Sequence, residues 1–254
     1  MKYLFNGFSN SRQSAATGNL SLLVEHNGYT ILVDTSGSPA QALRIAGLDP
    51  LQLDAIMITH AHCDHTYAFP SIIQDMLIGG RTKALRVLGN QKALDVCKKL
   101  IGIYNFDKKT TLMPISWEIT EDNTVTLSPD MKVTSFALFH RPLMPVQGFI
   151  FATSTSKLSF FPDSVATEPY PQAASGSDVV IHEAGGVDAD RLHVNQNGHS
   201  TGTQAGILAK KLNAGKLIVC HLPSDETSHQ LILEDAQRHC IEAELPKVHH
   251  WYDL

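Results

Sequence analysis

The segment Ile58–His65 has the sequence ITHAHCDH, which places three histidines, an aspartate and a thiol within eight residues. The apolar run Ala55–Ile58 leads into it and predicts a strand buried on both faces. Imidazole and carboxylate groups are ligands that borderline divalent ions such as zinc prefer. The pattern H-x-H-x-D-H therefore predicts a metal-binding loop at a strand end. Its candidate ligands are His60, His62, Asp64 and His65.

The composition predicts one globular α/β domain over residues 1–254, because 43% hydrophobic residues supply a substantial core. The formal net charge of -5 and the lack of a basic cluster argue against nucleic-acid binding through phosphates. The sequence contains neither a signal peptide nor an apolar run long enough to span a membrane, which predicts a cytoplasmic protein without membrane partners. The four cysteines are widely spaced and are expected to be reduced.

Apolar strands and amphipathic helices alternate along most of the chain. Strands are expected at 2–8, 20–25, 30–34, 55–58, 85–88, 146–153, 157–161, 178–182 and 216–221, with three or four more between 110 and 140. Helices are expected at 39–46, 67–78, 91–101 and 202–212. The dipeptide Asn27-Gly28 predicts a hairpin, so the chain should open as an antiparallel meander.

Four ligands on one loop cannot complete two coordination shells, so further ligands must lie downstream. His140, Asp163 and His221 each follow a strand-like run and are the candidates. A single strand-end histidine can also be a polar cap, but the shared placement favours ligands.

The motif His60-x-His62-x-Asp64-His65, followed by His140, Asp163 and His221, resembles the metallo-β-lactamase superfamily. Gly198-His199-Ser200-Thr201 and Ile181-His182-Glu183-Ala184 are similar to the H-S-T and H-E-A-T signatures of its ribonuclease Z-like branch. The resemblance implies a four-layer αβ/βα sandwich with two divalent ions, zinc before manganese or iron. It implies that His60, His62 and His140 bind one ion, that Asp64, His65 and His221 bind the other, and that Asp163 bridges them.

The resemblance also bears on two further residues. The superfamily often has an aspartate behind the metal loop, so Asp34, which ends the strand at 30–34, could support that loop. The family pattern allows varied residues at the position of Cys63, which is interpreted as a small filler rather than a ligand.

The expected chemistry is hydrolysis by a hydroxide that bridges the two ions. Asp64, His199 and Glu183 are the catalytic candidates. His199 would protonate the leaving group, because histidine titrates near physiological pH and the capping box Thr201-x-x-Gln204 starts a helix beside it. His199 could instead only mark the start of that helix. Glu183 could orient His199, as the resemblance suggests, or satisfy backbone donors at a strand end.

Substrate size is inferred from the interval between His140 and Asp163. A predicted hairpin fills it and leaves no room for the long arm with which true tRNA-processing members of the branch grip tRNA. We therefore expect a phosphodiesterase for a small or nucleotide-like diester rather than an enzyme for folded RNA. A narrow pocket beside His199 lined by Phe139, Arg141, Phe149 or Phe161 would favour a small substrate. The alternatives are an arm-less tRNA 3′-processing endonuclease, a thioesterase or lactonase, and a non-catalytic binding protein. The branch also suggests a homodimer.

Overall fold

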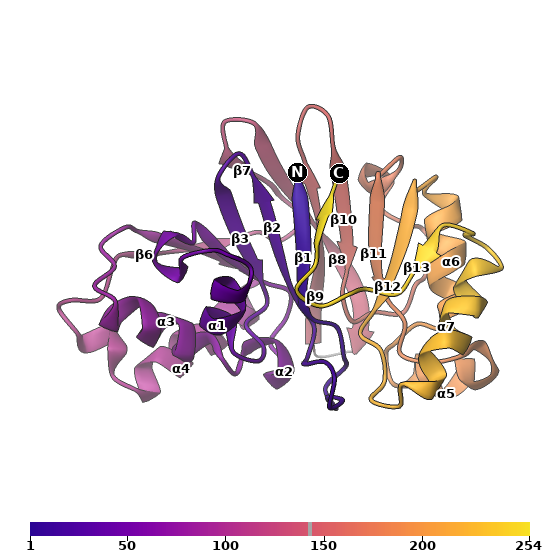
Figure 1. Cartoon of the computed structure of the whole chain (residues 1–254), viewed down its shortest axis with the longest axis horizontal. Helices are drawn as coiled ribbons and strands as arrows, with labels where there is room; N and C mark the ends of the chain where they lie inside the picture. Colours follow the sequence, from indigo (N-terminus) through magenta and orange to yellow (C-terminus); the bar gives the residue numbers. More distant parts are fainter. Residues whose placement is uncertain (142–143) are drawn as a thin grey trace.

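Two seven-stranded sheets form the centre of the molecule, and helices cover both outer faces (Figure 1). The computed structural model describes residues 1–141 and 144–254. The predicted hairpin region between His140 and Asp163 therefore contains two residues, 142 and 143, that lie outside the described part of the chain. None of the helices in the described ranges is long and apolar enough to cross a membrane.

The first sheet combines the predicted meander with a parallel half. Its strands, in order across the sheet, are β14 (Trp251–Asp253), β1 (Lys2–Gly7), β2 (Ser21–His26), β3 (Tyr29–Val33), β4 (Ala55–Ile58), β5 (Leu85–Gly89) and β6 (Ile115–Ile119). Strands β14 to β3 are antiparallel and β3 to β6 are parallel. Asn27 and Gly28 have φ values of 50° and 80°, as a tight hairpin turn requires. The connecting helices are α1 (Pro39–Ile45), η1 (Pro50–Gln52), α3 (Phe69–Ile78), α4 (Gln91–Ile103) and η2 (Phe106–Lys108).

The second sheet also has an antiparallel and a parallel half. Its strands, in order, are β13 (Ala243–Glu244), β12 (Lys216–Cys220), β11 (Val179–Glu183), β10 (Lys157–Phe161), β9 (Met144–Ala152), β8 (Met131–Arg141) and β7 (Thr124–Ser128). Strands β10 to β13 are parallel, so β10, β11 and β12 all end at the same edge. The helices that follow are η3 (Gln172–Ala174), η4 (Asp188–Asp190), α5 (Arg191–Gln196), α6 (Gly202–Lys211) and α7 (Thr227–Gln237).

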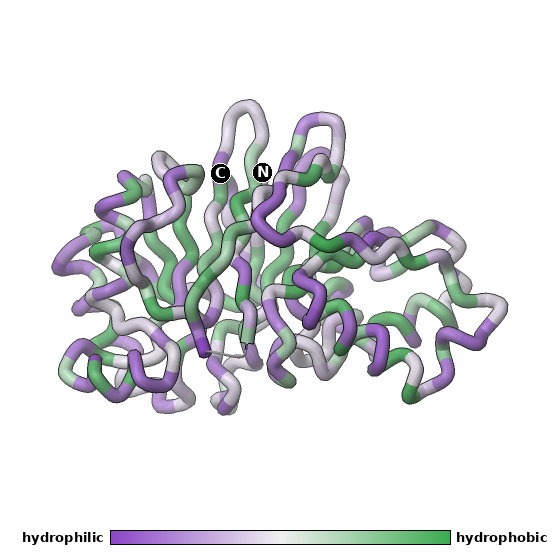
Figure 2. The backbone as a smooth tube through the Cα atoms, turned by 180° about the vertical axis from the view of Figure 1, so that it is seen from behind, coloured by the Kyte–Doolittle hydropathy of each residue, from purple (hydrophilic) through white to green (hydrophobic). Residues whose placement is uncertain are grey.

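Three apolar clusters hold the layers together. The central cluster lies between the sheets and includes Phe5 and Phe149. A second packs the first sheet against α1, α3 and α4 and includes Ile72, and a third packs the second sheet against α6 and α7 and includes Leu208. Figure 2 shows apolar segments along the central strands and polar residues on the outer turns. This layering confirms the predicted four-layer αβ/βα sandwich.

The helix predicted over residues 67–78 is present, but its predicted first residue is wrong. A short helix, α2 (Cys63–Thr66), forms within the ITHAHCDH segment, and α3 begins separately at Phe69. Pro70 lies in the first turn of α3, where the missing N–H of proline is no loss. Asp64 and His65 are therefore held on a helical turn that follows β4, rather than on an open loop.

Candidate metal centre

The seven predicted ligand residues converge at one edge of the molecule, where strands of both sheets end. Their donor atoms form two groups, and within each group all donors lie within 4.8 Å of one another. The first group is His60, His62, His140 and Asp163, and the second is Asp64, His65, Asp163 and His221. Asp163 follows β10 and belongs to both groups, as expected for a ligand shared between two ions.

Asp34 and Thr59 fix the orientation of two of the histidines. The Oδ2 atom of Asp34 accepts hydrogen bonds from Nδ1 of His65 (2.7 Å) and from Oγ1 of Thr59 (2.8 Å). Because the Thr59 hydroxyl donates to Asp34, its oxygen accepts from Nδ1 of His60 at 3.0 Å. An imidazole with its proton on Nδ1 keeps its lone pair on Nε2. Both rings therefore present Nε2 as a metal ligand, and the predicted support from Asp34 is present.

Gly198 fixes the orientation of the His140 ring. Its carbonyl oxygen accepts from Nδ1 of His140 at 2.7 Å, which again leaves the lone pair on Nε2. Gly198 has a φ of 84°, and a Cβ atom at this position would lie only 2.2 Å from the carbonyl oxygen of His140. Only glycine tolerates both conditions. The backbone of the G-H-S-T segment is therefore part of the structure that supports the metal centre.

The carboxylate oxygens of Asp163 face the Nε2 atoms of three histidines. Its Oδ2 atom lies 3.1 Å from Nε2 of His221 and 3.8 Å from Nε2 of His60, and its Oδ1 atom lies 3.4 Å from Nε2 of His65. In the described part of the chain, Oδ1 of Asp163 and Nε2 of His65 and His221 have no hydrogen-bond partner although they are buried. Facing lone pairs repel unless a proton or a metal ion lies between them. The residues present therefore fit a pair of divalent ions.

The charge states of these groups also suit cations. Burial raises the pKa of Asp163, but the charges of His221 and His65 outweigh burial and hold this pKa well below its usual range. Burial lowers the pKa of His60 well below its usual value, and the charge of His65 adds to this effect. The carboxylates of Asp163 and Asp34 raise the pKa of His65 despite its burial, so this ring holds a proton that a bound ion would displace.

Replacing Asp34 by asparagine should weaken metal binding by about 10- to 100-fold. Asp34 uses both carboxylate oxygens, since Oδ1 accepts from the backbone N–H of Thr59 and Oδ2 from His65 and the Thr59 hydroxyl. An amide has one acceptor oxygen, so its NH₂ group would face one of these sets of donors and the Nε2 atoms would lose their fixed direction. Competition with a coloured chelator would measure this affinity. Asp75→Asn is the matched control, because Asp75 pairs with Arg44 away from the centre. Equal affinities of the Asp34 variant and this control would contradict the assigned support.

His199 lies beside the ligand histidines. Its ring centroid is 4.8 Å from that of His140 and 5.0 Å from that of His221. His199 lies two residues before the N-cap Thr201 of α6, where the predicted capping box with Gln204 is present. Burial lowers the pKa of His199, but the charge of Glu183 and the hydrogen bond with it raise this pKa to about 9. Glu183, His199 and His221 also form a third group of donors within 4.8 Å.

Glu183 serves both of the roles that the sequence left open. Its Oε1 atom accepts from Nδ1 of His199 at 3.1 Å and from the backbone N–H groups of Ser164 (2.9 Å) and Ser200 (3.0 Å). Its Oε2 atom accepts from the backbone N–H of Gly185 at 2.9 Å. The carboxylate is fully buried at the end of β11. It therefore orients His199 and also connects the loops that surround that residue.

Replacing Glu183 by glutamine should lower the free energy of unfolding by about 1–3 kcal/mol. The new NH₂ group would face buried N–H donors, which leaves donors on both sides without an acceptor. Urea denaturation would measure the change. Glu242→Gln, at an exposed position, is the control and should leave the midpoint unchanged. A wild-type midpoint for Glu183→Gln would contradict the hydrogen bonds described for Glu183.

A cavity of about 340 Å³ opens over the metal centre. Of the four side chains that would favour a small substrate, only Arg141 lines this cavity. Phe149 and Phe161 are buried in the apolar clusters, and Phe139 lines a different cavity. Cys63 is exposed and lines the cavity over the metal centre. Its interpretation as a filler is therefore wrong, although it belongs to none of the ligand groups found in the described residues.

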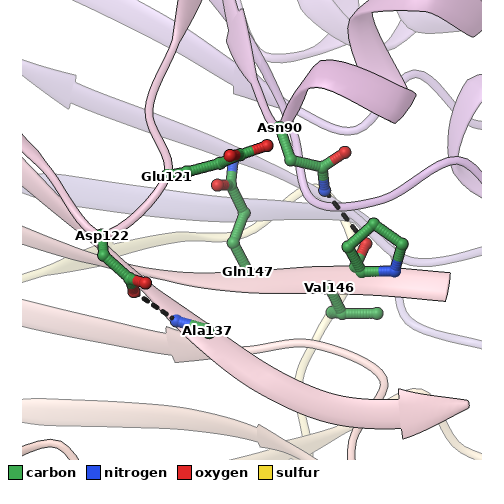
Figure 3. Close-up of a pocket in the computed structure, with 7 residues that line it drawn as sticks. Asn90, Glu121, Asp122, Ala137, Val146 and Gln147 are labelled. Carbon is green, nitrogen blue, oxygen red and sulfur yellow. Dashed lines mark hydrogen bonds between the residues drawn. The ribbon is translucent and has the colours of Figure 1, made fainter. Parts of the chain in front are cut away.

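A smaller hollow, of about 200 Å³, is lined by Asn90, Glu121 and Gln147 among other residues (Figure 3). Asn90 donates through Nδ2 to the carbonyl oxygens of Thr59 (3.3 Å) and Pro145 (3.0 Å), and the backbone N–H of Gln147 donates to the same Thr59 oxygen at 3.1 Å. None of the seven metal-ligand candidates is among its lining residues in the described part of the chain. These polar groups hold the backbone of Thr59, which the sequence analysis did not single out.

A family model described as the beta-lactamase superfamily domain matches residues 29–222. The chain belongs to the metallo-β-lactamase superfamily. A ribonuclease Z of Bradyrhizobium diazoefficiens is 23% identical over an alignment of length 282, which covers 92% of this chain and 93% of the relative. This similarity supports the predicted ribonuclease Z-like branch. The superfamily makes the chain a metal-dependent hydrolase and implies divalent metal ions, in agreement with the two donor groups.

Solved structures of the metallo-β-lactamase fold confirm the architecture. YhfI from Bacillus subtilis has a TM-score of 0.83 at 20% identity, with 99% of this chain and 98% of that chain covered. The short form of human tRNase Z has a TM-score of 0.80 at 19% identity, with 100% and 99% covered. At these identities the similarity establishes the fold alone.

Proposed function

We propose that this superfamily member is a dinuclear metal-dependent phosphodiesterase that acts on a small or nucleotide-like diester. The main support is the pair of donor groups that share Asp163 beside the His199–Glu183 pair. Zinc is the first candidate because the donors are mostly imidazole nitrogens, with manganese and iron as alternatives. His60, His62 and His140 would hold one ion, and Asp64, His65 and His221 the other, with Asp163 between them.

The chain supplies three functions around these ions. When bound, two dications supply Lewis-acid activation of a water and of a phosphoryl oxygen. Asp64 lines the cavity and would accept a hydrogen bond from the attacking water. His199 donates from Nδ1 to Glu183 and would present its Nε2–H to the leaving-group oxygen. Arg141 lines the same cavity and would attract an anionic substrate.

Two observations favour a small substrate. Between His140 and Asp163, the described residues 144–163 form β9 and β10, which pair with each other and leave no protruding arm. The cavity of about 340 Å³ is near the lower end of small-molecule sites, which span roughly 300–1,000 Å³. A single nucleotide-sized group matches this volume better than a folded RNA does.

Cleavage of precursor tRNA is the second candidate. The observation that favours it is the similarity to a ribonuclease Z over 92% of this chain. The two functions share the metal centre and differ in how the remainder of the substrate is held, so the centre alone does not distinguish them.

Rates on three substrates would distinguish these candidates. The metal-loaded protein should hydrolyse bis(p-nitrophenyl) phosphate and 2′,3′-cyclic nucleotides with a higher kcat/KM than a precursor tRNA. Diester hydrolysis no faster than that of His62→Ala would exclude the first proposal. A higher kcat/KM on precursor tRNA than on either diester would establish the second.

A further inference from the structure

The connection between β1 and β2 covers residues 8–20 and is the indigo segment below β1 in Figure 1. It leaves the first sheet but pairs with the chain that follows β12 of the second sheet. The backbone N–H of Asn10 donates to the carbonyl oxygen of Leu222 at 2.9 Å, and the N–H of Leu222 donates to the carbonyl oxygen of Phe8 at 3.0 Å. Leu222 directly follows the ligand candidate His221. The connection therefore fixes the backbone beside a metal-ligand candidate.

His221 depends on its backbone more than other ligand candidates do. Three of the other rings are each fixed by a hydrogen bond at Nδ1, those of His60, His65 and His140. Neither ring nitrogen of His221 has a hydrogen-bond partner in the described part of the chain. Its ring stacks between those of His65 and His199, which sets the plane of the ring but not the nitrogen that faces Asp163. The backbone has to determine that nitrogen, which is Nε2, at 3.1 Å from Oδ2 of Asp163.

The backbone conformation of His221 is itself strained. Its φ of 54° lies in the left-handed region, which side chains other than glycine rarely adopt. Such a conformation persists only where the surrounding structure enforces it. The two hydrogen bonds of Leu222 with Phe8 and Asn10 act directly after this residue, and Leu222 is 0% exposed. The connection is therefore in a position to hold the strained residue.

The same connection reaches Asp64 by a second route. The carbonyl oxygen of Ser9 accepts from the backbone N–H of Leu20 at 2.9 Å. The hydroxyl oxygen of Ser36 lies 2.9 Å from the carbonyl oxygen of Leu20 and 2.6 Å from that of Asp64. A hydroxyl has one proton to donate, and the shorter distance places it on Asp64. The backbone of Asp64 is therefore fixed through Ser36 to the end of the connection.

Both supported residues belong to one side of the centre. Asp64 and His221 are members of the second donor group and not of the first. Across residues 1–141 and 144–254, no hydrogen bond joins the connection to the unshared members of the first group, His60, His62 and His140. The support is therefore selective for the ion expected at Asp64, His65 and His221, which is called the second ion below.

We propose that residues 8–20 are a positioning element for the second ion and determine whether the centre holds one ion or two. The inference rests on the two-ion centre proposed above. Because the proposed reaction uses both ions, a change in this connection would abolish activity without altering a ligand.

Asn10→Pro tests the proposal, because proline lacks the N–H that donates to Leu222. Asn10→Ala is the matched control, since it keeps this N–H. Zinc would be titrated into the full chain in competition with a coloured chelator. We expect the wild type and Asn10→Ala to bind two zinc ions. Asn10→Pro should bind one ion as the wild type does and the other about 10- to 100-fold more weakly.

NMR of ¹⁵N-labelled histidine would identify the ion that is lost. At a zinc concentration that fills both sites of the wild type, the ring signals of His62 and His140 in Asn10→Pro should match those of the wild type. The ring signals of His221 should keep their metal-free shifts. A general loss of stability would affect both sets of signals, so this selective loss distinguishes positioning from a merely structural role.

Ser36→Ala tests the route to Asp64 and keeps the proposal testable if Asn10→Pro fails to fold. It should weaken the second zinc ion about tenfold. Ser38→Ala is its control, because Ser38 is exposed and its side chain forms no cap hydrogen bond. Equal weakening of both ions, weakening of the first ion alone, or wild-type zinc binding by either folded variant would overturn the proposal. Zinc binding is measured without substrate, so a failure of the proposed phosphodiesterase reaction would appear separately, in the rates on diesters.

Discussion

Asp163→Ala should reduce diester hydrolysis on the order of a thousandfold or more. Its carboxylate belongs to both donor groups, so its loss leaves each ion short of a ligand and removes the negative charge between two dications. The metal content should fall together with the rate. Elemental analysis after dialysis and initial rates with bis(p-nitrophenyl) phosphate would measure both.

Asp107→Ala is the matched control for this substitution. Asp107 is an exposed aspartate of η2 and belongs to neither donor group. Its variant should keep the metal content and rate of the wild type. If Asp163→Ala retained both ions and normal turnover, Asp163 would not be a shared ligand and the assigned centre would be wrong.

His199→Ala should lower kcat by about 100- to 10,000-fold on substrates that expel an alkoxide, such as 2′,3′-cyclic nucleotides. An alkoxide is a poor leaving group and needs a proton as the bond breaks. The loss should be much smaller with bis(p-nitrophenyl) phosphate, because p-nitrophenolate is stable without protonation. Comparing kcat on the two substrates therefore measures the proton-donor role directly.

Measuring the metal content distinguishes a proton-donor role of His199 from a role as a metal ligand. His199 also lies within the third donor group, with Glu183 and His221, and could in principle bind an ion there. A proton donor can be removed without loss of metal, whereas a ligand cannot. Unchanged metal content with a loss that depends on the leaving group supports the donor, and an equal loss on both substrates would rule it out. His193→Ala, on the exposed side of α5, is the control.

The convergence of the candidate ligands was predictable because strand ends are visible in a sequence. An apolar run that stops at a histidine or aspartate places that side chain at a sheet edge, and parallel strands bring such edges together. His140, Asp163 and His221 were found in this way, and the structure brings them to the loop after β4. The resemblance to a known family then divided them between two ions.

The lining of the site was not predicted, for a reason that lies in strand geometry. Strict alternation along β8 would separate His140 from both of its neighbours, yet Arg141 lines the same cavity as His140 while Phe139 lines another. The pairing of β8 with β9 shifts register between Leu138 and Arg141, and such a shift depends on the partner strand and leaves no mark in the local sequence pattern. The roles of Thr59 and Gly198 also depend on hydrogen bonds between segments far apart in the chain. For Gly198 the only local signal was a glycine directly before the H-S-T motif.

The metal centre, whose candidate ligands come from both sheets, should also affect the stability of the fold. Its donors extend from residue 60 to residue 221 and come from the ends of both sheets, so the unfolded chain can offer only the local cluster after β4. Ions bound to the complete set favour only the state in which the two halves have docked. By thermodynamic linkage, ions bound at the metal centre would stabilise the docked arrangement of the two halves. Chelation should therefore lower the melting temperature of the whole molecule and not only remove its activity.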